Sequence, residues 1–267
     1  MQASRFVQMT PRGALSVFFT AGFPRRDDTI PILAQLQAAG VDMIEIGFPF
    51  SDPVADGPTI QASSQKALAN GMTLDLLFEQ LRAMRDSVSI PVLLMGYLNP
   101  VEQYGFAQFL TDAAQCGIDG LIIPDMPFEE YVERYKPLYE RAGIRPVFLI
   151  SSRTQAERIR AFDCENPAFL YVLSSDAVTG GAVSLSAERE AFFKELSQMG
   201  LASRLIVGFG VRDRNSFCAV TRYTSGAIVG SAFVSLLSTL PQVEGDPHRT
   251  ELGQGSVVAE FIGRLRG

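Results

Sequence analysis

Short apolar runs recur along the chain, and each is followed by a stretch with helical character. The runs are rich in Val, Ile, Leu and Phe and lack strict alternation with polar residues, which is typical of strands covered on both faces. They predict eight buried strands of a parallel sheet. These lie at residues 15–21, 41–47, 91–97, 119–125, 145–151, 168–174, 204–210 and 226–232.

Amphipathic stretches lie between these runs, with Gly, Pro or a capping residue at their ends. Thr73 is expected to open one helix, and Gly40 to end another. The helices delimited in this way cover residues 29–40, 58–70, 73–87, 128–143, 154–162 and 185–200. Alternation of strand and helix eight times closes most naturally into a (β/α)₈ TIM barrel, an α/β fold. An open doubly wound sheet is the alternative.

The chain of 267 residues fits one such barrel as a single domain, 1–267, because α/β barrels commonly need about 250 residues. Extra helices are expected at the N-terminus, in the long 48–72 connection and at the C-terminus. The segment 241–267 begins as a polar loop and ends in an amphipathic stretch. No linker or low-complexity tract suggests a second domain.

Composition narrows the possible partners. The net charge is −6 and the pI is about 5.0, and no basic patch is evident, so nucleic acid is not an expected partner. No apolar segment approaches the roughly 18–20 residues that cross a bilayer, and we expect neither a membrane partner nor a signal peptide. Cys116, Cys164 and Cys218 form no C-x-x-C pair, and we expect reduced thiols in a cytoplasmic protein.

The stretch IEIGFPFSDPVADG, residues 44–57, places an acid inside a strand and more acids directly after it. Glu45 lies near the C-terminal end of the second strand, where TIM barrels carry their active sites. An inward-facing carboxyl would lose water and its pKa would rise, which suits acid–base catalysis. A buried ion pair is the alternative. The sequence alone favours Asp56 as a helix cap before Pro58, and leaves Asp52 without a role.

Glycines in the last three units suggest a phosphate site. VGFGV contributes Gly208 and Gly210, VGSAF contributes Gly230 and Ser231, and VTGGA at 178–182 adds a third pair. Loops after strands seven and eight, with a helix N-terminus, often bind phosphate in TIM barrels.

Other catalytic groups are scarce. His248 is the single histidine and lies in the C-terminal polar loop, so a His-ligated metal or a Ser-His-Asp triad is not expected. Lys66, Lys136 and Lys194, the three lysines, lie in predicted helices, away from the strand ends where a Schiff base would form. Carboxylates remain as the catalytic groups.

Over almost its whole length the sequence resembles the tryptophan synthase α-subunit family. The resemblance is carried by IEIGFPFSDPVADG and, in the same order as in the family, by FFTAGFP (18–24), GPTIQ (57–61), LLMGYLNPVEQYG (93–105), DGLIIPDMPFEE (119–130), GFGV (208–211) and GSAF (230–233). The family cleaves indole-3-glycerol phosphate to indole and glyceraldehyde 3-phosphate by a retro-aldol reaction.

The resemblance implies roles for individual residues. Glu45 would protonate indole C3 and take the proton of the C3′ hydroxyl, while Asp56 would hydrogen-bond the indole N–H, which replaces the cap interpretation. The remaining matches are substrate contacts at Phe18, Ile60, Tyr97, Tyr171 and Thr179, and phosphate contacts at Gly180, Gly208, Gly210, Gly230 and Ser231. No metal or cofactor is implied for this chain.

The family's partner is a β subunit that carries pyridoxal phosphate, in an α2β2 complex. The resemblance implies that the 48–60 loop around Pro53 and the 174–184 loop face this partner. SSDAVTG (174–180) departs from the family pattern, with Ser175 in place of an Arg and Ala177 in place of a Gly. Altered closure of the sixth loop is therefore expected. A stand-alone indole-releasing lyase and a weakly catalytic regulatory subunit are the alternatives.

Overall fold

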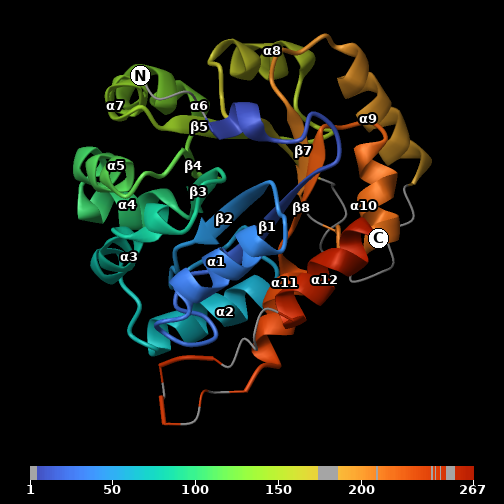
Figure 1. Ribbon diagram of the computed structural model, residues 1–267. Helices are drawn as coiled ribbons and strands as arrows, with labels where there is room; N and C mark the ends of the chain where they lie inside the picture. The colour runs from blue at the N-terminus through green and yellow to red at the C-terminus, as the bar shows by residue number, and fades with distance from the viewer. Residues whose placement is uncertain are drawn as a thin grey trace.

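The computed structural model describes residues 5–173, 186–208, 210–241, 243, 245–246, 248–250 and 256–267. Its centre is a closed barrel of eight parallel strands in the order β1 to β8 (Figure 1). The strands are β1 Ala14–Thr20, β2 Met43–Gly47, β3 Val92–Met95, β4 Gly120–Ile122, β5 Arg145–Ile150, β6 Leu170–Leu173, β7 Leu205–Gly208 and β8 Gly226–Val229.

Pairing between the first and last strands closes the sheet. Ala14 of β1 pairs with Gly226 of β8, and Val17 pairs with Val229. The open doubly wound alternative is therefore wrong, and the predicted TIM barrel is confirmed. All eight predicted runs begin and end within three residues of the observed strands. Six of the strands, β1, β2, β3, β4, β7 and β8, are buried along their whole length. Such burial explains why the runs do not alternate with polar residues.

Helices surround the barrel (Figure 1). They are α1 Thr29–Ala38, α2 Pro58–Ala69, α3 Leu74–Leu81, α4 Leu98–Tyr104, α5 Phe106–Gln115, α6 Phe128–Glu130, α7 Lys136–Ala142, α8 Ala156–Cys164, α9 Ala187–Gln198, α10 Arg214–Thr221, α11 Ser231–Ser238 and α12 Ser256–Arg266. Thr73 caps α3 by accepting a hydrogen bond from the Leu76 N–H, as predicted. Gly40, with φ of +82°, follows the end of α1.

Three details differ from the predicted helices. The extra N-terminal element is a single 3-10 turn, η1 Arg5–Gln8. The stretch 73–87 is divided into α3 and a 3-10 turn, η2 Met84–Asp86. The stretch 128–143 contains a π-helical turn, η3 Tyr131–Tyr135, between α6 and α7. The pattern of apolar residues does not distinguish these turns from an α-helix, because the same face stays buried through them.

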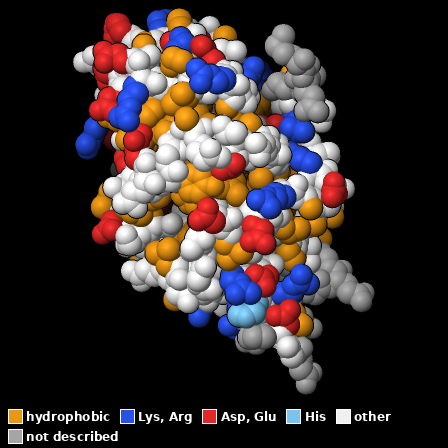
Figure 2. Space-filling model, turned by 90° about the vertical axis from the view of Figure 1, so that its left-hand side faces the viewer, with side chains coloured by type: hydrophobic (Ala, Val, Ile, Leu, Met, Phe, Trp, Pro, Cys, Tyr) orange, Lys and Arg blue, Asp and Glu red, His pale blue; other side chains and the backbone are white. Residues whose placement is uncertain are grey.

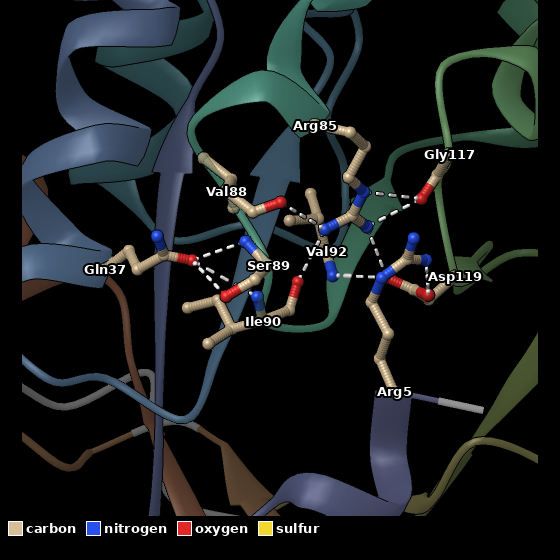
Figure 3. Close-up of polar contacts among 9 residues, drawn as sticks. All are labelled: Arg5, Gln37, Arg85, Val88, Ser89, Ile90, Val92, Gly117 and Asp119. Atoms are coloured by element: carbon tan, nitrogen blue, oxygen red, sulfur yellow. Dashed lines mark hydrogen bonds and ion pairs between the residues drawn. The ribbon is translucent and has the colours of Figure 1, made fainter. Parts of the chain in front are cut away.

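Polar contacts tie the N-terminal ends of the strands together, opposite the mouth of the barrel. Asp119, just before β4, accepts hydrogen bonds from Arg85 at 2.5 Å, Arg5 at 2.8 Å and the Val92 N–H at 2.9 Å. Figure 3 shows the Arg85 guanidinium pointing toward the Gly117 carbonyl and the Asp119 carboxylate, with Arg5 reaching the same carboxylate from η1. Gln37 holds the turn before β3 in a similar way, through the N–H groups of Ser89 and Ile90. This end of the barrel is therefore fixed by structural contacts.

The described surface carries charged side chains of both signs (Figure 2). On the face drawn in Figure 2, acidic and basic side chains are intermixed and apolar patches lie between them. None of the described helices combines the length and the apolar character needed to cross a membrane. The three cysteines are free, with Cys116 buried and the other two exposed.

Candidate active site

Glu45 lies inside the barrel, in the middle of β2. Its register partners are Phe18 of β1 and Leu93 of β3, and its side chain is fully buried. No described residue forms an ion pair with Glu45, so the buried ion-pair alternative finds no support in the described part of the chain. The sequence correctly placed this acid inside the barrel near its C-terminal end.

The two carboxylate oxygens of Glu45 have different surroundings. Oε1 accepts a hydrogen bond of 2.9 Å from the Ser16 hydroxyl, whereas Oε2 is buried and has no partner among the described residues. Burial raises the pKa of Glu45 to about 8, and the Ser16 hydrogen bond acts in the opposite direction. Near neutral pH, Glu45 can therefore hold a proton in the resting protein and exchange it during a reaction.

Asp56 lies in the loop that joins β2 to α2, and the structure corrects its assignment as a helix cap. The N-cap of α2 is Gly57, with no side-chain cap bond. Asp56 Oδ2 instead accepts a hydrogen bond of 2.9 Å from the Tyr97 hydroxyl, whose oxygen accepts another from the Ala55 N–H. Burial raises the pKa of Asp56, and the Tyr97 hydrogen bond opposes this rise. A carboxylate held in this way suits a ligand N–H.

The loop that carries Asp56 is fastened at several points. Ser64 of α2 donates to the Phe50 carbonyl and accepts from the Phe50 N–H, both at 2.9 Å. Gln61 donates to the Asp56 carbonyl, also at 2.9 Å. Because these side chains come from α2, the long 48–72 connection both supplies Asp56 and keeps it in place.

A narrow pocket opens at the C-terminal ends of β1, β2 and β3. It brings together four residues of the predicted site, Phe18, Asp56, Ile60 and Tyr97. Glu45 does not line it, but Gly47 does, two residues further along β2 on the same face. The pocket therefore lies directly above Glu45, and its aromatic and aliphatic walls suit a planar apolar group.

Tyr171 lies on β6, and the glycines of the last units lie at or just after the ends of β7 and β8, of which β8 pairs with β1. A Cβ at Gly230 would lie 3.5 Å from the Cβ of Phe18, so this glycine borders the same mouth. A Cβ at Gly208 would come within 2.1 Å of the Tyr171 ring, so only glycine leaves room for this tyrosine. Tyr171 is buried, and burial raises its pKa well above the usual value. Gly210 has φ of +78°, a conformation that favours glycine. Gly208 and Gly210 therefore shape the wall beside the predicted phosphate site.

Ser231 begins α11, and Gly230 is its N-cap. The first N–H groups of a helix have no intrahelical partners, and the helix dipole favours an anion there. The first turn of α11 contains no acidic residue that would repel such an anion. The predicted phosphate site at Gly208, Gly210, Gly230 and Ser231 is consistent with this geometry. Thr179, Gly180 and the SSDAVTG departure lie outside the described residues.

The structure adds polar groups that sequence reasoning did not select. Ser16 and Ser64 are buried hydroxyls that contact Glu45 and the Asp56 loop, respectively. One signal was available for Ser16, since it is the lone polar residue among the first five of the apolar run LSVFFTA. Its partner, however, is 29 residues away in the sequence.

Among the described residues, no other set of catalytic side chains lines this pocket. Lys66, Lys136 and Lys194 lie on α2, α7 and α9, as predicted, and none lines the pocket. Within the described ranges, no group of His, Cys, Asp and Glu has the arrangement of a metal site. A (β/α)₈ barrel with a buried, protonatable carboxyl, a second carboxylate beside an apolar pocket and a helix that begins at the same mouth is typical of a TIM-barrel enzyme.

Comparisons with known proteins identify the family. The family model for the tryptophan synthase alpha chain matches residues 6–258. The chain is 46% identical to the tryptophan synthase alpha chain of Flavobacterium johnsoniae over 94% of each chain. It is 50% identical to that of Christiangramia forsetii over 82% of this chain and 86% of the relative. The chain belongs to the tryptophan synthase alpha chain family.

Solved structures agree with this assignment. A mutant tryptophan synthase alpha-subunit from Pyrococcus furiosus has a TM-score of 0.83 and 30% identity, over 97% of this chain and all of that one. A chain of tryptophan synthase from M. tuberculosis has a TM-score of 0.80 and 27% identity, over 98% of each. The reaction is accordingly the lyase reaction of this family, cleavage of indole-3-glycerol phosphate to indole and glyceraldehyde 3-phosphate.

Proposed function

We propose that this chain cleaves indole-3-glycerol phosphate with Glu45 as the acid and base and Asp56 as the group that stabilises the indole nitrogen. The observation that carries the proposal is the pair of carboxyl groups at the mouth. Glu45 is buried with a pKa raised to about 8, and Asp56 is held by Tyr97 beside an apolar pocket. These environments suit two different tasks on one substrate.

The first step is protonation of indole C3. Protonated Glu45 gives its proton to C3, which places a positive charge on the ring as a C2=N1 double bond. Asp56 accepts a hydrogen bond from the N1–H and stabilises this charge. A pre-positioned carboxylate in a pocket with little water is an effective electrostatic stabiliser of such an intermediate.

The second step breaks the C3–C3′ bond. The Glu45 carboxylate takes the proton of the C3′ hydroxyl, the bond electrons return to the ring, and N1 regains its lone pair. The products are indole and glyceraldehyde 3-phosphate, and Glu45 is protonated again. The charged ring accepts the electrons itself, so we propose that this chain uses no cofactor and no Schiff-base lysine.

The other site residues bind and orient the substrate in this proposal. Phe18, Ile60 and Tyr97 line the pocket that would hold the indole ring. The N-terminus of α11 with Gly230 and Ser231, together with Gly208 and Gly210, would bind the phosphate. The remaining proposed contacts are those of Tyr171, Thr179 and Gly180.

We further propose that the chain works with a β subunit in an α2β2 complex and that indole passes to this partner for tryptophan synthesis. Val54, next to Asp56 in the same loop, is 84% exposed, while Pro53 is buried and lines the pocket. A partner that covers Val54 would therefore press on the loop that holds Asp56. Pyridoxal phosphate belongs to the partner in this arrangement.

Product analysis tests the proposal. The purified chain is incubated with indole-3-glycerol phosphate, without pyridoxal phosphate and with EDTA present, and indole and glyceraldehyde 3-phosphate are quantified. We expect the two products in equal amounts. Intact substrate after prolonged incubation, both alone and with a β subunit, would contradict the proposed function.

A further inference from the structure

Ser16 is placed to influence Glu45 directly. Its side chain is 1% exposed, and its hydroxyl donates the 2.9 Å hydrogen bond that Glu45 Oε1 accepts. Within the described part of the chain, this is the hydrogen bond that distinguishes the two oxygens, because Oε2 has no partner. The family resemblance assigns no role to Ser16.

The register of β1 and β2 explains the direction of this contact. Ser16 pairs with Met43, whereas Glu45 pairs with Phe18, so Ser16 lies one layer nearer the N-terminal end of the barrel. The hydrogen bond therefore draws Oε1 away from the mouth. The pocket lies on the opposite side of Glu45, above Gly47. Oε2 is consequently the oxygen left for a substrate in the mouth.

We propose that Ser16 is a positioning residue for the cleavage reaction: its hydroxyl holds Oε1 so that Oε2 alone exchanges protons with C3 and the C3′ hydroxyl of the substrate. The inference rests on the proposed role of Glu45. Ser16 itself neither gains nor loses a proton. One oxygen serves both transfers, and the side chain does not need to rotate between them. Loss of the Ser16 hydroxyl therefore affects the two proton transfers more than it affects substrate binding.

The described residues around Glu45 determine whether a change in its titration can be assigned to Ser16. From β1 it meets Ser16 and Phe18, and from β3 Leu93, none of which titrates. Two titratable groups among the described residues lie nearby, Tyr171 on β6 and Asp56 on the loop after β2. In addition to burial, the charges of Glu45 and Asp56 both contribute to the raised pKa of Tyr171. Burial keeps the pKa of Tyr171 well above its usual value, so Tyr171 stays neutral across the working range. No described Lys or Arg pairs with Glu45.

Removal of the Ser16 hydroxyl has a defined electrostatic effect. A donor to a carboxylate stabilises its charged form, so Ser16→Ala raises the pKa of Glu45 further. A hydrogen bond to a charged group corresponds to a change of about one to two pH units. Since protonated Glu45 starts the proposed reaction, we expect kcat/KM of the parent to fall as the pH rises above about 8. In Ser16→Ala this decline moves to higher pH.

The experiment compares Ser16→Ala, Ser16→Thr and Thr224→Ala with the parent. Thr224 is a buried hydroxyl before β8, at the far end of the barrel, and controls for loss of a buried hydroxyl as such. We measure kcat, KM and the pH profile, and follow the Glu45 carboxyl carbon by NMR of ¹³C-glutamate-labelled protein. The resonance is assigned by its absence in Glu45→Gln.

We expect Ser16→Ala to lower kcat about 3- to 30-fold with little change in KM, in line with loss of orientation and of one hydrogen bond. Its alkaline decline and its Glu45 resonance should both titrate at higher pH. Ser16→Thr should restore most of kcat and the parent pH profile, and Thr224→Ala should match the parent.

Three results would overturn the proposal for Ser16: a parent-like kcat and titration in Ser16→Ala, an equal effect in Thr224→Ala, or a loss in KM alone. The Glu45→Gln variant separates this failure from that of the proposed function. Loss of activity in Glu45→Gln with a parent-like Ser16→Ala refutes only the role of Ser16. Full activity in Glu45→Gln refutes the proposed mechanism itself.

Discussion

At the residue scale, the chemistry depends on the burial of one carboxyl group. Glu45 could be selected from the sequence because it interrupts an apolar run near a strand end. The role of Asp56 could not be read from its neighbours, because Pro58 and Gly57 equally suit a capping loop. Its decisive contact, Tyr97, is 41 residues away in the sequence. Ser16 interrupts an apolar run, but its partner Glu45 is 29 residues away in the sequence, so its contact could not be read from its neighbours either.

The raised pKa of Glu45 has a consequence for stability. The pKa rises from the ordinary 4.5 to about 8 on folding, so between these pH values the folded protein retains a proton that the unfolded chain releases. The free energy of unfolding therefore falls as the pH rises from 4.5 to 8. Glu45→Gln removes this cost of ionisation. We expect the variant to exceed the parent by about 2–5 kcal/mol at pH 9 and to match it near pH 5.

Denaturant unfolding of both proteins at pH 5 and pH 9 checks this expectation. Glu79→Gln is the control, because it removes an exposed charge from α3. The same difference in stability between parent and Glu45→Gln at both pH values would show that Glu45 is not a buried, protonated group.

At the element scale, apolar periodicity was sufficient to find the strands and most of the helices. It did not resolve the π-helical turn Tyr131–Tyr135 or the 3-10 turns, which keep the same residues buried. It also gave no bounds for α4, α5, α10 and α11. The phosphate site was predicted from glycine positions, yet its main feature, the free N-terminus of α11, depends on where that helix begins.

A negative charge at the start of α11 should weaken phosphate binding. Ser231 is the first residue of the helix, so Ser231→Asp places a carboxylate where the anion is proposed to bind. We expect KM for indole-3-glycerol phosphate to rise about tenfold or more, because helix-terminus and like-charge effects of this size reach a few kcal/mol. The value of kcat should change less.

Ser235→Asp is the matched control for this variant. Ser235 is an exposed residue on the same helix, one turn further along, so it adds the same charge away from the proposed site. Steady-state kinetics and binding of glycerol 3-phosphate measure the effect. Equal KM values for the two variants would argue against phosphate binding at this N-terminus.

At the scale of the whole molecule, closure of the barrel could be predicted by counting repeats, since eight strand–helix units rarely form anything else of this length. The sequence alone could not show which face meets a partner. The structure exposes Val54 on the loop that carries Asp56, whereas Pro53, which the family resemblance placed at the interface, is buried.

The proposed contact with a β subunit makes Val54 a test position. Val54→Glu puts a charge on an apolar residue that is 84% exposed, and we expect it to reduce co-elution with the β subunit and the stimulation of lyase activity by that subunit. Val7→Glu is the control, because Val7 is 78% exposed in η1, at the other end of the barrel. Equal stimulation of both variants would place the interface elsewhere.

The central claim is that Glu45 performs both proton transfers. The most direct measurement is the single-turnover rate of indole formation by Glu45→Gln, compared with the parent under saturating enzyme. Binding of an unreactive indole-alkyl phosphate serves as the control for an intact pocket. We expect binding to persist while the rate falls at least about 10²- to 10⁴-fold, the usual contribution of a general acid–base group. Indole formation at the parent rate would contradict the mechanism.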